Sequence, residues 1–455
     1  MHAHQKAAWL STLLAEEGDF ATVLRGAALV VVIRVLASAV GFASVILLAR
    51  WMGPSQYGRY SFAIASMVLL AYPATLGLPG AAVRFVAQYA AVNDWQHVVG
   101  FMKVSSWLAF SCGVLIATVA IGVVVVFKSY LDPAYVAPSI VAFAGVPVVA
   151  LTIVRSETIR GLGWLTLAWG PLQLGQPLFL LIMTALILFS ATQLTATMAV
   201  GASIVAYAAS LIAQWGFLHS RLGPRIRVGT RRQLGQWLRV GVSFLWISVA
   251  NVILLQAGVI VVGLFLTPQD VAIYSAAVAT SGLVALPLFA AVALGAPKFA
   301  ALHAQQRQIE LQALFTNIVQ LTFWPSLAIA IIFIALGSMV LRLFGPGFEQ
   351  GYPVLLILTL GQLLSSFVGP VANLLNMTGH HILTARVQAT SAILALVFGL
   401  VFTRNSGSVG TAVAFSAATA LGNAWLTIFV VHKLEIYPSV GLCLRGKITR
   451  CSKLV

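Results

Sequence analysis

The sequence predicts an all-α integral membrane protein with twelve transmembrane helices in two parallel six-helix bundles. The first reason is composition: of the 455 residues, 60% are hydrophobic and only 8% are charged, against about 25% charged in soluble proteins. The second is that apolar runs of about 20 residues, each long enough to cross a bilayer, recur along the whole chain. The third is an internal repeat, described below.

The apolar runs give the spans in chain order. The predicted spans are 26–49, 59–82, 104–127, 136–154, 166–190, 195–218, 240–266, 272–294, 313–341, 353–376, 384–402 and 408–431. A transmembrane barrel is excluded, because its strands would alternate with period two over about 10 residues. An even number of spans places both termini on one side of the membrane.

The distribution of Lys and Arg predicts that both termini are cytoplasmic. In this orientation Arg34 falls inside a span and five of the 26 cations fall in outer loops, namely Arg50, Arg59, Lys128, Arg342 and Arg404. The other cations lie on the inner side, as expected from the positive-inside rule. This bias also accounts for most of the net charge of +16, so no nucleic-acid partner is needed to explain it.

A basic segment divides the chain into two halves. The stretch "HSRLGPRIRVGTRRQLGQWLR" (219–239) contains six arginines and no acid. We interpret it as a cytoplasmic linker loop that fixes topology and contacts anionic membrane lipids; a regulatory or partner site is the alternative. The predicted domains are therefore an N-terminal bundle (1–218), this linker, a C-terminal bundle (240–432) and a basic cytoplasmic tail (433–455).

The two halves resemble each other in sequence. With a shift of 214, residues 54–90 align with 268–304 without a gap, and the pairs include Pro54 with Pro268, Pro73 with Pro287, and Arg84 with Lys298. Six spans per half give the halves the same orientation, so we expect a pseudo-twofold axis along the membrane normal. That arrangement suits alternating access to a cavity between the bundles.

The aligned segments also carry helix-breaking residues. "YPATLGLPGA" (72–81) and "LPLFAAVALGAPKF" (286–299) interrupt the second and eighth spans. Interrupted helices at corresponding places in two halves are typical of a transport site, because freed backbone groups must be satisfied by protein or by a wet cavity. Simple kinks that allow helices to pack are the alternative.

Charges inside the spans suggest the sign of the substrate. On this map all ten Asp and Glu residues fall in loops or tails, whereas cation-coupled exporters usually need a carboxylate within the bilayer. Arg34 lies within the first span, Arg84 and Lys298 end the second and eighth, and Arg25 stands at the inner mouth of the first. We expect a cationic cavity that binds an anionic headgroup through these four residues, since guanidinium matches phosphate oxygens. Snorkelling to the interface is the alternative.

Sequence signatures of catalysis or metal binding are missing. There is no GxxxxGK[ST], HExxH or GxSxG motif, and the three cysteines form no CxxC pair. The eight histidines show no metal-ligand spacing, and Asp132 and Glu349 stand alone on short outer loops. The sequence therefore predicts no cofactor, no metal site and no enzymatic activity.

Several segments together resemble the polysaccharide transporter family. "LLARWMGPSQYGRYSFAIASMVLLAYPATLGLPGAAVRFVAQY" (47–89) is similar to its amino-terminal signature, with an LAR-x-x-GP-x-x-YG-x-Y loop followed by V-R-F. "IRGLG" (159–163), "LFGPGFEQGYPVLLIL" (343–358) and "LLNMTGHHILTA" (374–385) resemble its later landmarks.

The resemblance implies a fold and a function. The fold is that of the multidrug, oligosaccharidyl-lipid and polysaccharide exporter superfamily, with two six-helix bundles in a V. The implied substrate is an oligosaccharide on a polyprenyl diphosphate, flipped across the bacterial cytoplasmic membrane for surface polysaccharide such as O-antigen, capsule or exopolysaccharide. Related lipid II flippases bind the diphosphate through arginines in spans 1, 2 and 8, which is where Arg34, Arg84 and Lys298 lie. A polysaccharide polymerase and chain-length machinery are the implied partners.

Two weaker expectations complete the prediction. Asn251 and Gln256 in the seventh span are candidates for binding sugar hydroxyls, against the alternative of interhelical hydrogen bonds. The alternative functions are a multidrug cation antiporter, which requires a carboxylate within the membrane, and a membrane polymerase or ligase, which requires essential residues in outer loops.

Overall fold

The computed structural model describes residues 2–129, 132–190, 193–223, 231 and 233–437. For residues 2–33 and for 290, 293, 294, 296 and 297 it describes the backbone alone. Within these residues the chain is built of helices joined by short turns, as the composition predicts. Residues 224–230 and 232 of the predicted linker 219–239 and most of the tail 433–455 lie outside the described residues.

Among the residues that the structure describes, the first half of the chain supplies eight α-helices and a π-helical turn. They are α1 (His2–Ala74), α2 (Leu78–Ala91), α3 (Trp95–Val126), α4 (Pro133–Ala144), α5 (Val146–Gly161), α6 (Leu165–Trp169), η1 (Gly170–Gly175), α7 (Gln176–Ser190) and α8 (Ala196–Leu222).

The described part of the second half continues in the same way, with two 3₁₀ turns. Its elements are α9 (Leu234–Phe265), α10 (Pro268–Ser281), η3 (Gly282–Ala285), α11 (Leu286–Ala304), α12 (Gln308–Arg342), η4 (Phe348–Gly351), α13 (Tyr352–Val368), α14 (Val371–Met377) and α15 (His381–Leu434).

The longest two helices are each a pair of helices joined at a glycine. The backbone leaves helical geometry at Gly53 (φ 70°) in α1 and at Gly407 (φ 62°) in α15. A side chain at such a positive φ would be strained, and glycine avoids that cost. Among the described residues nine helices are long and apolar enough to cross a membrane, or ten with the bent pair α4–α5. Since α1 and α15 each contain two predicted spans, this arrangement is compatible with twelve.

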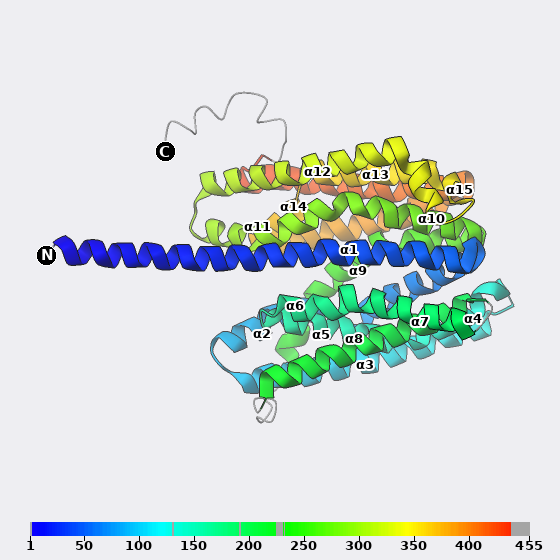
Figure 1. Ribbon diagram of the computed structural model, residues 1–455, viewed down its shortest axis with the longest axis horizontal. Coiled ribbons are helices and arrows are strands. Elements are labelled where there is room, and N and C mark those ends of the chain that lie inside the picture. Colours follow the sequence, from blue (N-terminus) through cyan, green and yellow to red (C-terminus); the bar gives the residue numbers. More distant parts are fainter. Residues whose placement is uncertain (1, 130–131, 191–192, 224–230, 232, 438–455) are drawn as a thin grey trace.

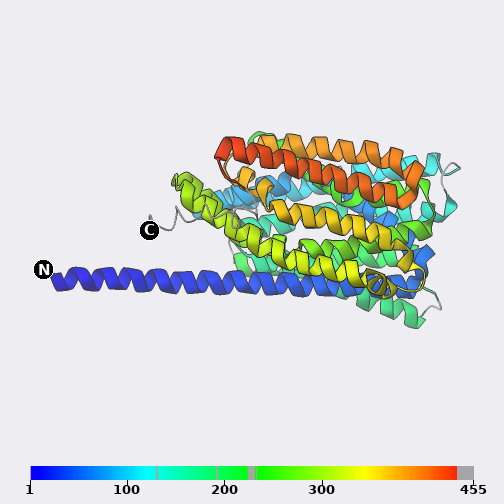
Figure 2. The ribbon, with the colours of Figure 1, turned by 90° about the horizontal axis from the view of Figure 1, so that it is seen from above.

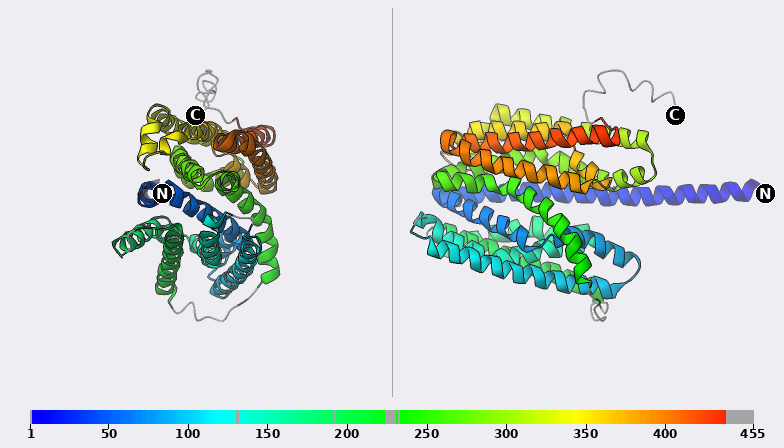
Figure 3. Two further views of the ribbon diagram at one scale, coloured as in Figure 1. Left: turned by 90° about the vertical axis from the view of Figure 1, so that its right-hand side faces the viewer. Right: turned by 180° about the vertical axis from the view of Figure 1, so that it is seen from behind.

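The helices form two groups (Figure 1). The N-terminal group contains α2–α8 and the C-terminal group contains α10–α15, while α1 runs between them. Helix α9 crosses from one group to the other, so that it contacts α2 as well as α15 (Figure 3). Seen from above, the amino-terminal end of α1 extends beyond both groups (Figure 2). The domain boundaries at 218 and 240 stay a prediction.

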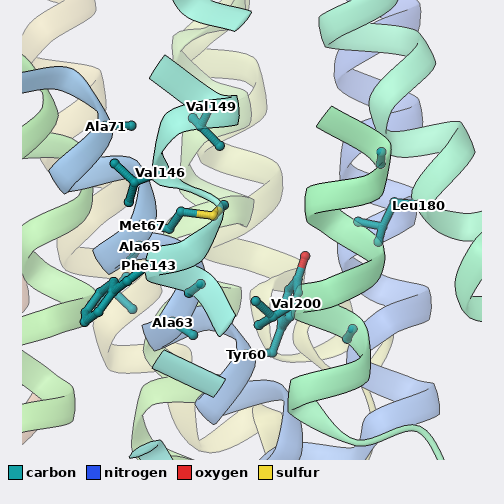
Figure 4. Close-up of a cluster of buried hydrophobic side chains, with 14 of the residues drawn as sticks. Tyr60, Ala63, Ala65, Met67, Ala71, Phe143, Val146, Val149, Leu180 and Val200 are labelled. Carbon is teal, nitrogen blue, oxygen red and sulfur yellow. The ribbon is translucent and has the colours of Figure 1, made fainter. Parts of the chain in front are cut away.

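Small side chains allow the helices of the N-terminal group to pack closely. Ala63, Ala65 and Ala71 of α1 are fully or almost fully buried, and α1 contributes Met67 to the same cluster. In Figure 4 these residues lie beside Phe143 and Val146 of α4 and α5. Small residues at helix contacts are typical of membrane proteins, in which close van der Waals packing holds the helices together.

Both predicted helix interruptions are present, although the second is displaced. The first break separates α1 from α2 at 75–77, where Leu76 (φ 53°) and Gly77 (φ 68°) adopt left-handed geometry. The break in the eighth span is the 3₁₀ turn η3 at Gly282–Ala285, just before the stretch 286–299 in which we predicted it. Helix α11 runs unbroken through that stretch, so the two interruptions do not fall at aligned positions.

The prediction that every acid lies in a loop or tail is wrong for Asp270 and Glu310, which lie in the first turns of α10 and α12, and for Glu157 in α5. The fourth span was predicted to end at 154, but α5 continues to Gly161 and carries Glu157 in its last turns. Hydropathy alone ended the span too early, because a carboxylate beside a cation can remain on a buried helix face when the two form an ion pair.

Helix α1 joins the two groups at the end of the molecule where Gly53 lies, which we call the Gly53 end. A Cβ atom built on Gly58 of α1 would overlap the carbonyl oxygen of Pro268 at the start of α10. The Arg50 Nε donates a hydrogen bond to the carbonyl oxygen of Leu343, and the rings of Phe42 and Phe344 meet edge to face at 5.7 Å. The predicted orientation places this closed end on the outer side of the membrane.

Candidate functional site

Arg34 lies where α1 passes between the two groups. It is 19 residues before Gly53, or roughly 28 Å along a helix that rises about 1.5 Å per residue. Its guanidinium carbon lies 5.4 Å from the ring centroid of Trp169 in α6 and 5.1 Å from that of Phe289 in α11. The half-buried guanidinium therefore contacts one aromatic ring from each half of the chain, within the distance at which cation–π attraction acts.

A second arginine lies near Arg34 and is paired with a carboxylate. Arg160 of α5 is an electrostatic neighbour of Arg34. Its Nη2 lies 2.8 Å from Oε2 of Glu157, one turn earlier on the same helix. The side chains of Arg160 and Glu157 are 37% and 20% exposed, so the acid is the more buried partner. Tyr72, in the last turn before the break at 75–77, is an electrostatic neighbour of Glu157. We call Arg34, Arg160, Glu157, Trp169 and Phe289 the Arg34 site.

A buried hydrogen-bond network fixes the elements behind the Arg34 site. The Gln214 Nε2 of α8 donates to Ser156 Oγ at 2.6 Å and to the carbonyl oxygen of Ala168 at 3.2 Å. Ser156 Oγ also donates to the Ala168 carbonyl at 2.9 Å. Ser156 and Ala168 directly precede Glu157 and Trp169, so this network ties the backbone of α5 to that of α6 where the site residues emerge.

Two of the other predicted diphosphate-binding cations are exposed on their helices. Arg84 is exposed on α2, with its guanidinium carbon 5.8 Å from the ring of its neighbour Phe85. Lys298 is exposed on α11. The side chain of Arg25 lies outside the described residues. The interactions described here join Arg160 with Arg34, and roles for Arg84, Lys298 and Arg25 stay predictions.

The two predicted sugar-binding residues lie on α9. Asn251 is exposed and its Nδ2 lies 3.5 Å from Oε1 of Gln388 in α15, while Gln256 is half-buried. Next to this contact, toward the amino-terminal ends of the same two helices, is a mostly apolar groove of about 500 Å³. Its lining residues are Ser243, Trp246, His381, Ile382, Ala385, Arg386 and Ala389. The Asn251 contact supports the interhelical alternative without testing a sugar role.

Sequence reasoning missed most partners of Arg34. Trp169 and Phe289 belong to other predicted spans, and an aromatic ring in an apolar run gives no sign of the cation that it will contact. A signal for the ion pair was present, because Glu157 and Arg160 are three residues apart and would face each other on a helix. Ending the predicted span at 154 concealed this ion pair.

Among the described residues no group of three or more His, Cys, Asp or Glu is placed to hold a metal ion.

The fold and the span composition define a multi-pass membrane protein with the fold that MATE transporters and the lipid II flippase MurJ share. Within that class, the chain belongs to the polysaccharide biosynthesis protein family, whose sequence profile matches residues 23–303. A curated relative, the probable low-salt glycan biosynthesis flippase of Haloferax volcanii, is 22% identical over 420 residues, which cover 88% of this chain and 83% of the relative.

Solved structures confirm the predicted fold. A multidrug resistance MATE family transporter in its inward-facing conformation superposes with a TM-score of 0.72, at 15% identity, covering 89% of this chain and 98% of that one. The outward-facing conformation of a MATE transporter gives 0.62 at 14% identity, covering 89% and 95%. The lipid II flippase MurJ gives 0.65 at 12% identity, covering 90% and 88%.

Proposed function

We propose that this protein flips polyprenyl-diphosphate-linked oligosaccharides across the bacterial cytoplasmic membrane for the synthesis of surface polysaccharide. Membership of the polysaccharide biosynthesis family and similarity to a glycan biosynthesis flippase support the class of substrate. The observation that carries the headgroup assignment is the position of Arg34, a permanent cation between the two helix groups.

The physical problem of flipping explains why a cation belongs there. A diphosphate is costly to move through hydrocarbon, whereas a polyprenyl tail can stay in lipid. Arg34 can donate two parallel hydrogen bonds to phosphate oxygens, and it contacts both halves through Trp169 and Phe289. In an alternating-access cycle the halves would separate at the Gly53 end while the headgroup stays bound to Arg34. Asn251 and Gln256 would contact sugar hydroxyls, and a polymerase would take over the flipped product.

The test is a flipping assay in proteoliposomes with a fluorescent short-chain polyprenyl-diphosphate oligosaccharide. We expect Arg34→Ala to slow initial flipping at least tenfold, because a hydrogen bond to a charged group contributes about 1.5–3 kcal/mol. Arg34→Lys keeps the charge but loses the planar fork, so an intermediate rate is expected. Arg404→Ala, an exposed cation at the Gly53 end, is the matched control. Wild-type flipping by Arg34→Ala would refute the headgroup role.

A multidrug cation antiporter is the second candidate, because the structure places a carboxylate, Glu157, within a helix of the fold that MATE exporters share. The ion pair with Arg160 neutralises that carboxylate, which favours an anionic substrate over a cationic drug. Ethidium efflux from cells that express the protein, measured for the wild type and Glu157→Gln, separates the two functions. Efflux that depends on Glu157, without flipping in proteoliposomes, would establish the antiporter.

A further inference from the structure

The Arg34 site contains two arginines and a carboxylate, although Arg34 alone would be enough to bind one phosphate group. Arg34 and Arg160 are electrostatic neighbours that repel each other. Glu157 offsets this repulsion through its 2.8 Å contact with Arg160. With Arg160 paired, the three side chains leave about one net positive charge between the helix groups, although a diphosphate carries at least two negative charges.

We propose that Arg160 is a second diphosphate-binding residue and that Glu157 holds it until the headgroup arrives. This inference rests on the flippase function proposed above. In the empty site the ion pair keeps Arg160 from repelling Arg34. When the diphosphate binds, Arg160 leaves Glu157 for the second phosphate group, while Arg34 binds the first. The ion pair thereby selects for a headgroup with two phosphates, because a monophosphate can be bound by Arg34 with the ion pair intact.

The position of the pair makes such an exchange possible. Arg160 is 37% exposed at the end of α5, so its long side chain can swing without disturbing the core. The released carboxylate would need a new donor, since leaving a half-buried charge unpaired is costly. Tyr72, the electrostatic neighbour of Glu157 in α1, carries a hydroxyl that can donate a hydrogen bond to the released carboxylate.

The same contact links headgroup binding to the interrupted second span. Tyr72 lies just before the break, and the Thr75 hydroxyl donates to its carbonyl oxygen at 2.7 Å. Gly161, next to Arg160, packs so tightly on α2 that an added Cβ would lie 2.9 Å from the carbonyl oxygen of Ala82. A shift of Glu157 toward Tyr72 would therefore act on the segment that joins α1 to α2.

The experiment measures binding of farnesyl diphosphate and farnesyl monophosphate to the full chain in detergent, by titration calorimetry. We expect the wild type to prefer the diphosphate. Arg160→Gln should weaken diphosphate binding about tenfold or more and leave monophosphate binding within twofold. Glu157→Gln removes the competing charge at nearly constant volume, so diphosphate affinity should rise severalfold. If Arg160 and Glu157 had merely structural roles, Arg160→Gln and Glu157→Gln would both bind the diphosphate and the monophosphate more weakly.

Arg155→Gln is the matched control, because Arg155 lies on the same helix but contacts Ser106 of α3 at 3.5 Å. If Arg160→Gln proves unstable, Arg160→Lys replaces it and should lose part of the diphosphate preference. The inference is overturned if Arg34→Ala abolishes diphosphate binding while Arg160→Gln and Glu157→Gln behave like Arg155→Gln. If the wild type binds neither ligand, the proposed function fails with it.

Discussion

Gly58 tests whether contact between the two groups holds the Gly53 end closed. In Gly58→Ala the added Cβ would overlap the Pro268 carbonyl oxygen, a backbone atom that no rotamer change can remove. Forcing one extra carbon into such a contact costs about 1–3 kcal/mol, whereas the better helix propensity of alanine stabilises the closed and open states equally and cancels. A cost of about 1–3 kcal/mol in the closed state alone shifts the closed–open equilibrium by a factor of about 5–150.

The assay is distance measurement by double electron–electron resonance in a cysteine-free background. Spin labels at Lys128, which follows α3, and Arg404 of α15 report on the two groups, and both side chains are exposed. Gly58→Ala should enlarge the fraction of long distances. Gly122→Ala on α3 is the matched control, since its Cβ would meet nothing within 4 Å. Identical distance distributions for Gly58→Ala and the wild type would show that this contact does not hold the end closed.

Two further predictions concern local stability. Hydrogen bonds from His97, first of all from its side chain, lower the pKa of Asp94, which caps α3. Asp94→Ala should therefore cost about 1 kcal/mol at pH 7. This difference should shrink as the pH falls below ~4 and vanish only below the lowered pKa of Asp94, because a lowered carboxyl pKa stabilises the fold above the unfolded pKa and the gain is lost as the folded-state carboxyl is protonated. Thermal unfolding at both pH values measures it, and an unchanged difference at low pH would contradict the assignment. Gln214→Leu should cost about 0.5–1.5 kcal/mol by removing its bonds to Ser156 and Ala168; equal melting temperatures would show that this network adds no stability.

The fold could be predicted well because its signals accumulate over long segments. An apolar run of about 20 residues is long enough to mark a span whatever it packs against. The turns that divide α1 and α15 lie at Gly53 and Gly407, between predicted spans. Errors arose where the signal depended on one residue. Glu157 ended a predicted span too early, and the proline at 287 suggested a break that the structure places at Gly282–Ala285.

The candidate site could be predicted only in part. A permanent charge in an apolar run is conspicuous, so Arg34 was identified from the sequence. Its neighbours were not, because Trp169, Phe289 and Arg160 reach it from three other helices. The alignment of Arg84 with Lys298 gives the two cations corresponding positions in the two halves, and a shared role in binding the headgroup stays a prediction.

By itself the sequence determined that this chain lies in a membrane as a set of helices, which family it resembles, and which cation stands within its first span. These properties depend on local composition, since transfer of each segment into lipid is governed mainly by the residues that it contains. The tertiary structure alone decided that Arg34 lies between an aromatic ring from each half and near Arg160 of α5. Such contacts join helices far apart in the chain, and they follow from how the helices pack against one another.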